Sequence, residues 1–229
     1  SSSSSSTSAT SSKPIPTASI LSPWDFSYQP SPDGKDLNLL IMFHGLAAIL
    51  QPRETTFPSQ HRHSLPPSAP PVYDPQYNDL PSPDPAPTVP RLKRLLEALS
   101  KEGWAYNRIH LFGWGQGGTM ALALAASVTD RLGSTVSVCG GPSSRPTGKL
   151  ETPILYFHRL DARSAASEKT VSSLRNTFKE VEVLQGDIGR GKGDMPKSRS
   201  EWEGIMKFWS EVLSRDDRWK GEEVYEVVQ

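Results

Sequence analysis

The fold is decided by one stretch of the sequence, Arg108-Ile109-His110-Leu111-Phe112-Gly113-Trp114-Gly115-Gln116-Gly117-Gly118-Thr119-Met120-Ala121-Leu122-Ala123-Leu124-Ala125. Its first residues form an apolar run short enough for a buried strand. Closely spaced glycines follow, and glycine is the residue that most readily allows a tight turn. The small apolar residues after them suit a helix that has no polar face and lies against a sheet. The stretch therefore predicts a strand, a sharp turn and a buried helix over residues 117–126.

Further segments of both kinds lie on either side of this stretch. Contiguous apolar residues predict a strand buried on both faces at 37–43, with a turn at 32–35 and an alternating segment at 24–28 completing a hairpin. Strands are also predicted at 135–139, 153–158 and 181–184. Helices are predicted from Pro90 to a stop at Gly103, at 166–178, and after a cap at Ser200. This alternation indicates an α/β fold: a doubly wound, mostly parallel sheet with helices on both faces.

Composition divides the chain into one domain and three segments of biased sequence. Residues 1–20 are Ser-rich and are expected to form a disordered tail, residues 21–215 an α/β domain, and residues 216–229 a C-terminal tail. Within the domain, residues 48–90 hold more than half of the 21 prolines and are expected to form an insertion without regular structure. Three explanations stay open for it: a surface loop, a ligand for a proline-reading domain, or, over residues 47–87, the product of a splicing or frame error.

Charge and residue counts argue against several functional classes. The formal net charge is zero and no basic stripe is visible, so nucleic acid is not an expected partner. Cys139 is the only cysteine, which excludes an internal disulfide and a cysteine-based metal cluster. His61 and His63 stand two residues apart in a proline-rich segment, a poor arrangement for a metal, and we expect neither a metal nor another cofactor. Because no apolar run reaches the roughly 20 residues of a membrane span, stable membrane insertion is not expected.

Two motifs resemble those of a known family. One is Leu40-Ile41-Met42-Phe43-His44-Gly45-Leu46, and the other is the turn Gly113-Trp114-Gly115-Gln116-Gly117-Gly118. Together they resemble the phospholipase/carboxylesterase family of α/β-hydrolases, which includes the acyl-protein thioesterases and carries His-Gly-Leu-Gly-Asp and Gly-Phe-Ser-Gln-Gly-Gly at these places. The resemblance spans about residues 36–46 and 89–213. It implies a cytoplasmic serine hydrolase of acyl esters or thioesters, and a further core strand that this chain lacks because the proline-rich insertion replaces it.

The resemblance also gives each part of a serine-hydrolase site a position in this chain. Gly115 stands at the nucleophile position but has no hydroxyl. The backbone N–H groups of Leu46 and Gln116 would form the oxyanion hole. Asp161 is the best candidate for the triad acid, although it comes one residue earlier than in the family and could equally be a turn former. The base should be a histidine in the loop at 186–196, which contains none.

These departures predict a degenerate member of the family. With the nucleophile and the base both missing, covalent catalysis is not expected, and the old pocket would retain at most an acyl ester, an acyl thioester or an acylated protein as ligand. Two alternatives stay open. One is an active carboxylesterase or acyl-protein thioesterase with an atypical site, and the other is an interaction protein that works through its Pro-rich and Ser-rich segments. The sequence therefore leaves open whether the chain is an enzyme.

Overall fold

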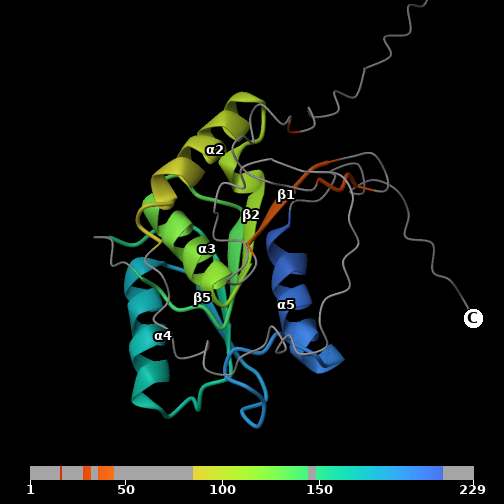
Figure 1. The fold of residues 1–229 in the computed structure, drawn as a ribbon. Coiled ribbons are helices and arrows are strands. Elements are labelled where there is room, and N and C mark those ends of the chain that lie inside the picture. Colours follow the sequence, from red (N-terminus) through yellow and green to blue (C-terminus); the bar gives the residue numbers. More distant parts are fainter. Residues whose placement is uncertain (1–15, 17–27, 32–35, 44–84, 144–147, 214–229) are drawn as a thin grey trace, which may run out of the picture.

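The central element is a five-stranded parallel sheet (Figure 1). The structure is a computed structural model that describes residues 16, 28–31, 36–43, 85–143 and 148–213. The strands follow one another across the sheet in chain order, and every neighbouring pair is parallel. They are β1 (Leu39–Phe43), β2 (Ile109–Trp114), β3 (Ser134–Val138), β4 (Ile154–His158) and β5 (Val181–Gln185). The predicted strands at these five places are confirmed.

Helices cover both faces of this sheet, as the alternating pattern predicted. Figure 1 shows a group of helices on one side of the sheet and a lone helix on the other. The first group is α2 (Val89–Lys101), α3 (Gln116–Ser127) and α4 (Ala165–Thr177), and the lone helix is α5 (Arg199–Val212). A short 3-10 turn, η3 (Tyr106–Arg108), leads into β2. None of the helices in the described ranges is long and apolar enough to cross a membrane.

The larger part of the core lies between the sheet and helices α2 to α4. The predicted stripe of α2 is buried there through Leu92, Leu96 and Leu99. Helix α3 has no polar face and is buried from Gly117 to Ala125. Full burial of a large aliphatic side chain stabilises a fold by about 1.5 to 3 kcal/mol. The helix after the glycine turn is therefore fixed on the sheet, and with it the turn itself.

A second cluster packs α5 against the opposite face of the sheet. Val136, Val138, Leu155 and Phe157 of β3 and β4 contact this helix together with Phe112 of β2. The ring of Phe112 lies 6.4 Å from that of Trp202 and 5.9 Å from that of Trp209, centroid to centroid. Aromatic pairs at these separations add to the stabilisation that burial gives. The chain that joins β5 to α5 must therefore cross the end of the sheet.

The prediction that the first strand is buried on both faces is wrong. Leu39, Ile41 and Phe43 pack against the larger core, but Leu40 is 43% exposed and Met42 63% exposed. The reason is its place in the sheet: β1 stands at the end of the strand order, whereas α5 covers the inner strands. The predicted loss of a core strand concerns residues 44–84, which lie outside the described residues, as do most of the tails and of the insertion at 48–90. Helix α2 begins at Val89, so the last two residues of the expected insertion are helical.

One local prediction also needs correction. The cap of α5 is Ser198, not Ser200: the Ser198 hydroxyl accepts a hydrogen bond from the Glu201 N–H at 3.2 Å. Ser198 and Glu201 have the spacing of a capping box. The helix therefore starts at the first serine whose hydroxyl can accept a free N–H group of the first turn. The expected first strand of the hairpin falls mostly on residues 24–27, outside the described part of the chain. Tyr28 belongs to no strand.

His110 ties the amino ends of the first three strands together. Its Nδ1 lies 2.9 Å from the Ser134 hydroxyl and its Nε2 3.2 Å from Asn38 Oδ1. Burial, and then the charges of Arg108 and Arg131, lower the pKa of His110 to about 4. The imidazole is therefore neutral near pH 7 and serves as a buried hydrogen-bonding post.

Candidate active site

The turn between β2 and α3 has the backbone of a nucleophile elbow. Gly115 caps α3 with φ of +56° and ψ of −119°, a conformation that side-chain-bearing residues adopt only under strain. Its N–H donates to the Val138 carbonyl at 2.8 Å, which ties the turn to the end of β3. A Cβ added at Gly115 would meet no atom within 4 Å. The position is therefore open and correctly shaped for a nucleophile, yet it carries no side chain.

Neighbouring glycines are needed for close packing rather than for the turn. A Cβ on Gly113 would meet the backbone of Gly117 within 3.0 Å, and a Cβ on Gly140 would meet the Gly115 carbonyl and the Thr119 N–H. Real Cβ atoms essentially never approach backbone that closely. The glycines at these two strand ends thus allow α3 to start directly on the sheet.

Of the two residues predicted to form the oxyanion hole, the structure describes Gln116 but not Leu46. Gln116 is the first residue of α3, and N–H groups in the first turn of a helix have no partner within the helix. Its side-chain Oε1 is also buried without a hydrogen-bond partner. Leu46 lies outside the described residues, so its assignment stays a prediction.

Asp161 is exposed, and its carboxylate has a local structural task. Its Oδ1 accepts a hydrogen bond from the Arg163 N–H at 2.9 Å, and its carbonyl accepts from the Ser164 N–H and hydroxyl. Ser164 in turn caps α4. Within the described ranges no hydrogen bond joins Asp161 to a histidine, and the geometry fits the turn-forming role that was the alternative to a triad acid.

His158 ends β4 and does not act as the missing base. It is buried, its ring stacks on Tyr156 at 5.2 Å, and its Nδ1 accepts from the Leu160 N–H at 3.2 Å. Burial lowers the pKa of His158, so the ring stays neutral with its proton on Nε2.

Arg159 determines the structure of the loop where the base should stand. It is 2% exposed and uses all five guanidinium N–H groups. Two of these bind the carboxylate of Glu201, with 2.9 Å between Nη2 and Oε2. The others donate to the carbonyls of Asp187, Asp194 and Met195 at 3.0 to 3.1 Å. We call this arrangement of Arg159, Glu201 and the three carbonyls the Arg159 clamp.

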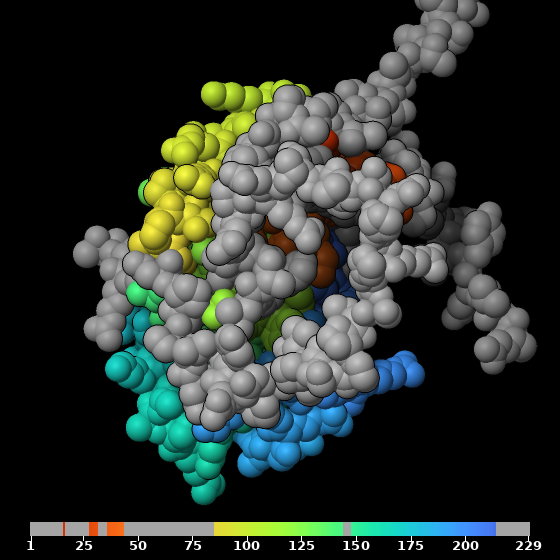
Figure 2. Space-filling view, in the orientation of Figure 1, coloured from red at the N-terminus to blue at the C-terminus, as the bar shows by residue number. Residues whose placement is uncertain are grey.

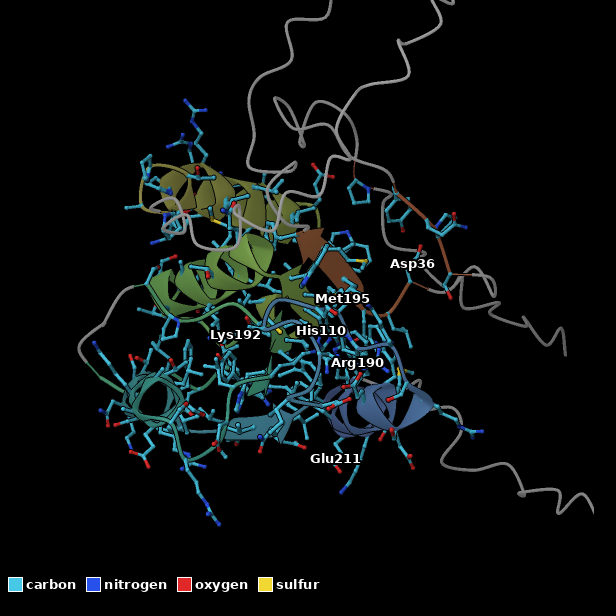
Figure 3. The ribbon with its side chains drawn as sticks, turned by 60° about the horizontal axis from the view of Figure 1, so that its bottom comes forward. Asp36, His110, Arg190, Lys192, Met195 and Glu211 are labelled. Carbon is cyan, nitrogen blue, oxygen red and sulfur yellow. The ribbon has the colours of Figure 1, made fainter. Side chains whose placement is uncertain are left out.

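Three successive strand ends hold the loop at 186–196. From β2, Trp114 Nε1 donates to the Gly193 carbonyl at 2.6 Å. After β3, the Cys139 thiol lies 3.6 Å from the Asp194 carbonyl, and after β4 Arg159 binds the same carbonyl. Figure 3, with the bottom of Figure 1 turned forward, labels Arg190, Lys192 and Met195 on this loop, and the sky-blue surface at the lower edge of Figure 2 belongs to this part of the chain. The loop is therefore fastened across the end of the sheet by its backbone carbonyls.

The charges in the clamp support one another. Hydrogen bonds from Arg159, and then from the N–H groups of Lys197 and Asp187, hold the pKa of Glu201 well below its usual range. Glu201 in turn raises the pKa of Arg159. Both groups are therefore charged near pH 7, and each compensates for the burial of the other. No local sequence pattern singles out Arg159 as a structural residue. The 42 residues that separate it from Glu201 hide the pair.

Cys139 does not replace the missing hydroxyl. It lies at the end of β3 with φ of +58°, and burial raises the pKa of its thiol to about 11. A protonated thiol is a weak nucleophile, and this one is directed to the Asp194 carbonyl. No group of three His, Cys, Asp or Glu side chains that could hold a metal occurs among the described residues. His61 and His63 lie outside them.

Comparison with known proteins identifies the family. A family model described as phospholipase/carboxylesterase matches residues 84–160, which contain α2, β2, the elbow, α3, β3 and β4. An uncharacterised hydrolase of Mycosarcoma maydis is 30% identical over an alignment of 247 residues. The alignment covers 91% of this chain and 89% of that protein. The chain belongs to the phospholipase/carboxylesterase family of α/β-hydrolases.

Solved structures with a related fold share less of the chain. The F65L variant of SOBER1 from Arabidopsis thaliana is 21% identical, with a TM-score of 0.47 over 57% of this chain and 65% of that one. A phospholipase/carboxylesterase from Dyadobacter fermentans is 18% identical, with a TM-score of 0.41 over 58% of this chain and 65% of that one. The chain thus spans less than two thirds of either of these two structures.

Proposed function

We propose that this chain is a family member without covalent catalysis, which binds an acyl ester, an acyl thioester or an acylated protein at the elbow. The observation that carries the proposal is the pairing of an open Gly115 in elbow geometry with the Arg159 clamp at the position of the base. Acyl transfer needs a nucleophile and a base within hydrogen-bond reach of each other. The N–H groups that begin α3 can still donate to a bound carbonyl oxygen, because backbone donors require no particular side chain.

Activity-based labelling tests the loss of catalysis. A fluorophosphonate probe reacts with an activated serine, so we expect no labelling of the purified full-length chain and no turnover of p-nitrophenyl esters. The variant Gly115→Ser should also stay inactive, because the loop at 186–196 holds no histidine to accept the hydroxyl proton. Stoichiometric labelling of the wild-type chain would instead support the alternative of an active esterase with an atypical site.

A binding measurement tests the retained ligand. S-octanoyl-N-acetylcysteamine is a simple acyl thioester, and its titration should shift the backbone amide resonance of Gln116 in a saturable way. Gly115→Leu should abolish this shift, since the new side chain fills the open space above the turn. Gly103→Leu is the matched control: Gly103 also has positive φ and open space around it, but it lies at the end of α2. Failure to saturate, or an equal effect of both variants, contradicts binding at the elbow.

A further inference from the structure

A pocket opens at the amino ends of the strands, at the opposite end of the sheet from the elbow. Its volume is about 340 Å³, within the range of small-molecule sites. The segment before β1, the start of β2 and the last turns of α5 form its walls. The lining residues are Ser31, Asp36, Leu37, Asn38, Leu40, His110, Trp209 and Leu213. Because these side chains lie at the amino ends of the strands, the pocket is separate from the candidate active site.

Asp36 supplies the only negative charge in this lining. Its Oδ2 accepts the Tyr28 hydroxyl at 2.8 Å and its Oδ1 accepts the Ser31 N–H at 2.8 Å, which fixes the orientation of the carboxylate. Burial and this carboxylate raise the pKa of Tyr28 to about 12, so the phenol stays a donor. No ion pair engages Asp36 within the described ranges. Each carboxylate oxygen retains a second lone pair with which to accept a hydrogen bond from a ligand.

The remaining walls are apolar or neutral. Leu37, Leu40 and Leu213 line the pocket beside the indole of Trp209, whose ring is held by Phe112. His110 is uncharged, because burial and the charges of Arg108 and Arg131 lower its pKa. Figure 3 labels Asp36 and His110 at separate places in this region.

We propose that this pocket binds an organic ammonium ion with an apolar tail. The ammonium group donates to Asp36, and the tail lies against Trp209 and Leu40. An ammonium close to an indole face also gains cation–π attraction, and Trp is the strongest partner for it. A carboxylate ligand is excluded by repulsion from Asp36, and a neutral alcohol loses the charge-assisted hydrogen bond. The exposure of Leu40 and Leu213, at 43% and 38%, leaves the apolar wall accessible.

Titration with n-hexylammonium tests the site in the full-length chain. Saturable shifts of the Trp209 indole N–H resonance are expected, with that resonance assigned through Trp209→Phe. Hexan-1-ol should bind about tenfold more weakly, because it lacks the charge but has the same tail. Hexanoate should not bind.

Asp36→Asn removes the charge with little change of shape and should weaken n-hexylammonium binding by about tenfold. Glu211→Gln is the matched control, since it removes a carboxylate from the exposed face of the same wall helix and should leave the affinity unchanged. Because Asp36 also orders Tyr28, Asp36→Asn could lose binding through misfolding, and a second variant that leaves Asp36 in place is needed. Leu40→Lys introduces a competing ammonium at an exposed position and should also weaken binding.

The proposal is overturned by three results: equal affinity for the amine and the alcohol, no effect of Asp36→Asn in a folded protein, or an equal effect of Glu211→Gln. Gly115→Leu should not alter n-hexylammonium binding, so the test is independent of the proposed function. A loss of n-hexylammonium binding in Gly115→Leu would also contradict a separate site.

Discussion

The corner between β2 and α3 and the loop between β5 and α5 belong to the same candidate site, but they depart from the family in opposite ways. At the corner, the backbone keeps the elbow conformation while Gly115 has lost the reacting side chain. At the loop, no histidine stands where the family has its base, and the Arg159 clamp fastens the backbone instead. Packing of α3 on the sheet maintains the corner whether or not chemistry follows. In the loop, Met195 packs against the smaller core cluster, and the polar contacts of the Arg159 clamp hold the backbone in place.

The largest expected effect comes from breaking the clamp. Arg159→Met leaves Glu201 buried without its partner, which should lower the free energy of unfolding by about 3 to 5 kcal/mol. Urea unfolding followed by tryptophan fluorescence measures this change. Arg175→Met, on the exposed side of α4, is the control and should change stability by less than about 0.5 kcal/mol. The double variant Arg159→Met, Glu201→Met should recover part of the loss; a double variant as unstable as the single one would contradict a charge-based clamp.

Lowering the pH to titrate Glu201 in the clamp should reduce the free energy of unfolding by a smaller amount. The pKa of Glu201 is lowered in the folded state, so its contribution is complete above the ordinary glutamate pKa and is lost as pH falls below it. The lowered pKa of His110 destabilises both proteins alike between pH 6.5 and about 4, so this loss cancels in the difference between them. The difference in stability between the wild type and Arg159→Met should therefore shrink only at acid pH. A difference that stays constant from pH 7 to pH 3 argues against this assignment.

At the corner, two adjacent glycines offer a matched pair. Gly140→Ala places a Cβ against the backbone of Gly115 and Thr119, and should lower stability by about 3 kcal/mol. Gly141→Ala meets only the Thr170 methyl at 3.9 Å and should be nearly neutral. Thermal unfolding of the two variants makes the comparison. Equal melting temperatures would show that the corner is less tightly packed than these contacts require.

Gly115→Ala should lower the free energy of unfolding by less than Gly140→Ala, since it introduces backbone strain but no steric clash. The positive φ disfavours any side chain by about 1 to 3 kcal/mol, while the space around the position is open. Urea unfolding gives the magnitude, and the amide spectrum shows whether Gln116 keeps its position. A stabilised Gly115→Ala variant would mean that the turn relaxes to negative φ and is not held in elbow geometry.

The smallest effect is expected where the two regions meet. Trp114→Phe removes the hydrogen bond to the Gly193 carbonyl and keeps most of the ring, so it should cost about 1 kcal/mol. Amide hydrogen exchange should speed up in the loop at 186–196 and stay unchanged in α3. Faster exchange in both regions would show that the corner depends on the loop.

Much of the architecture could be read from local patterns. The apolar run before Gly113 and the small residues after Gly118 predicted β2 and α3, because burial imposes its pattern directly on neighbouring residues. The stripe at Leu92, Leu96 and Leu99 predicted α2 in the same way. Capping was missed by two residues at α5, although Ser198 and Glu201 have the required spacing. The exposure of Leu40 and Met42 was missed because an apolar run does not reveal whether its strand lies at the end of a sheet.

By itself the sequence determined the family, the strand and helix order, and the lack of a hydroxyl at Gly115 and of a histidine in the loop at 186–196. Only the tertiary structure decided that Gly115 keeps an open elbow conformation and that Arg159 and Glu201 close the loop. It also decided that Asp36 and Trp209 share a pocket at the opposite end of the sheet. The physical reason is the distance along the sequence over which each interaction acts. Backbone preference and hydrophobic period act between near neighbours, whereas buried ion pairs and pockets arise from residues that folding alone brings together.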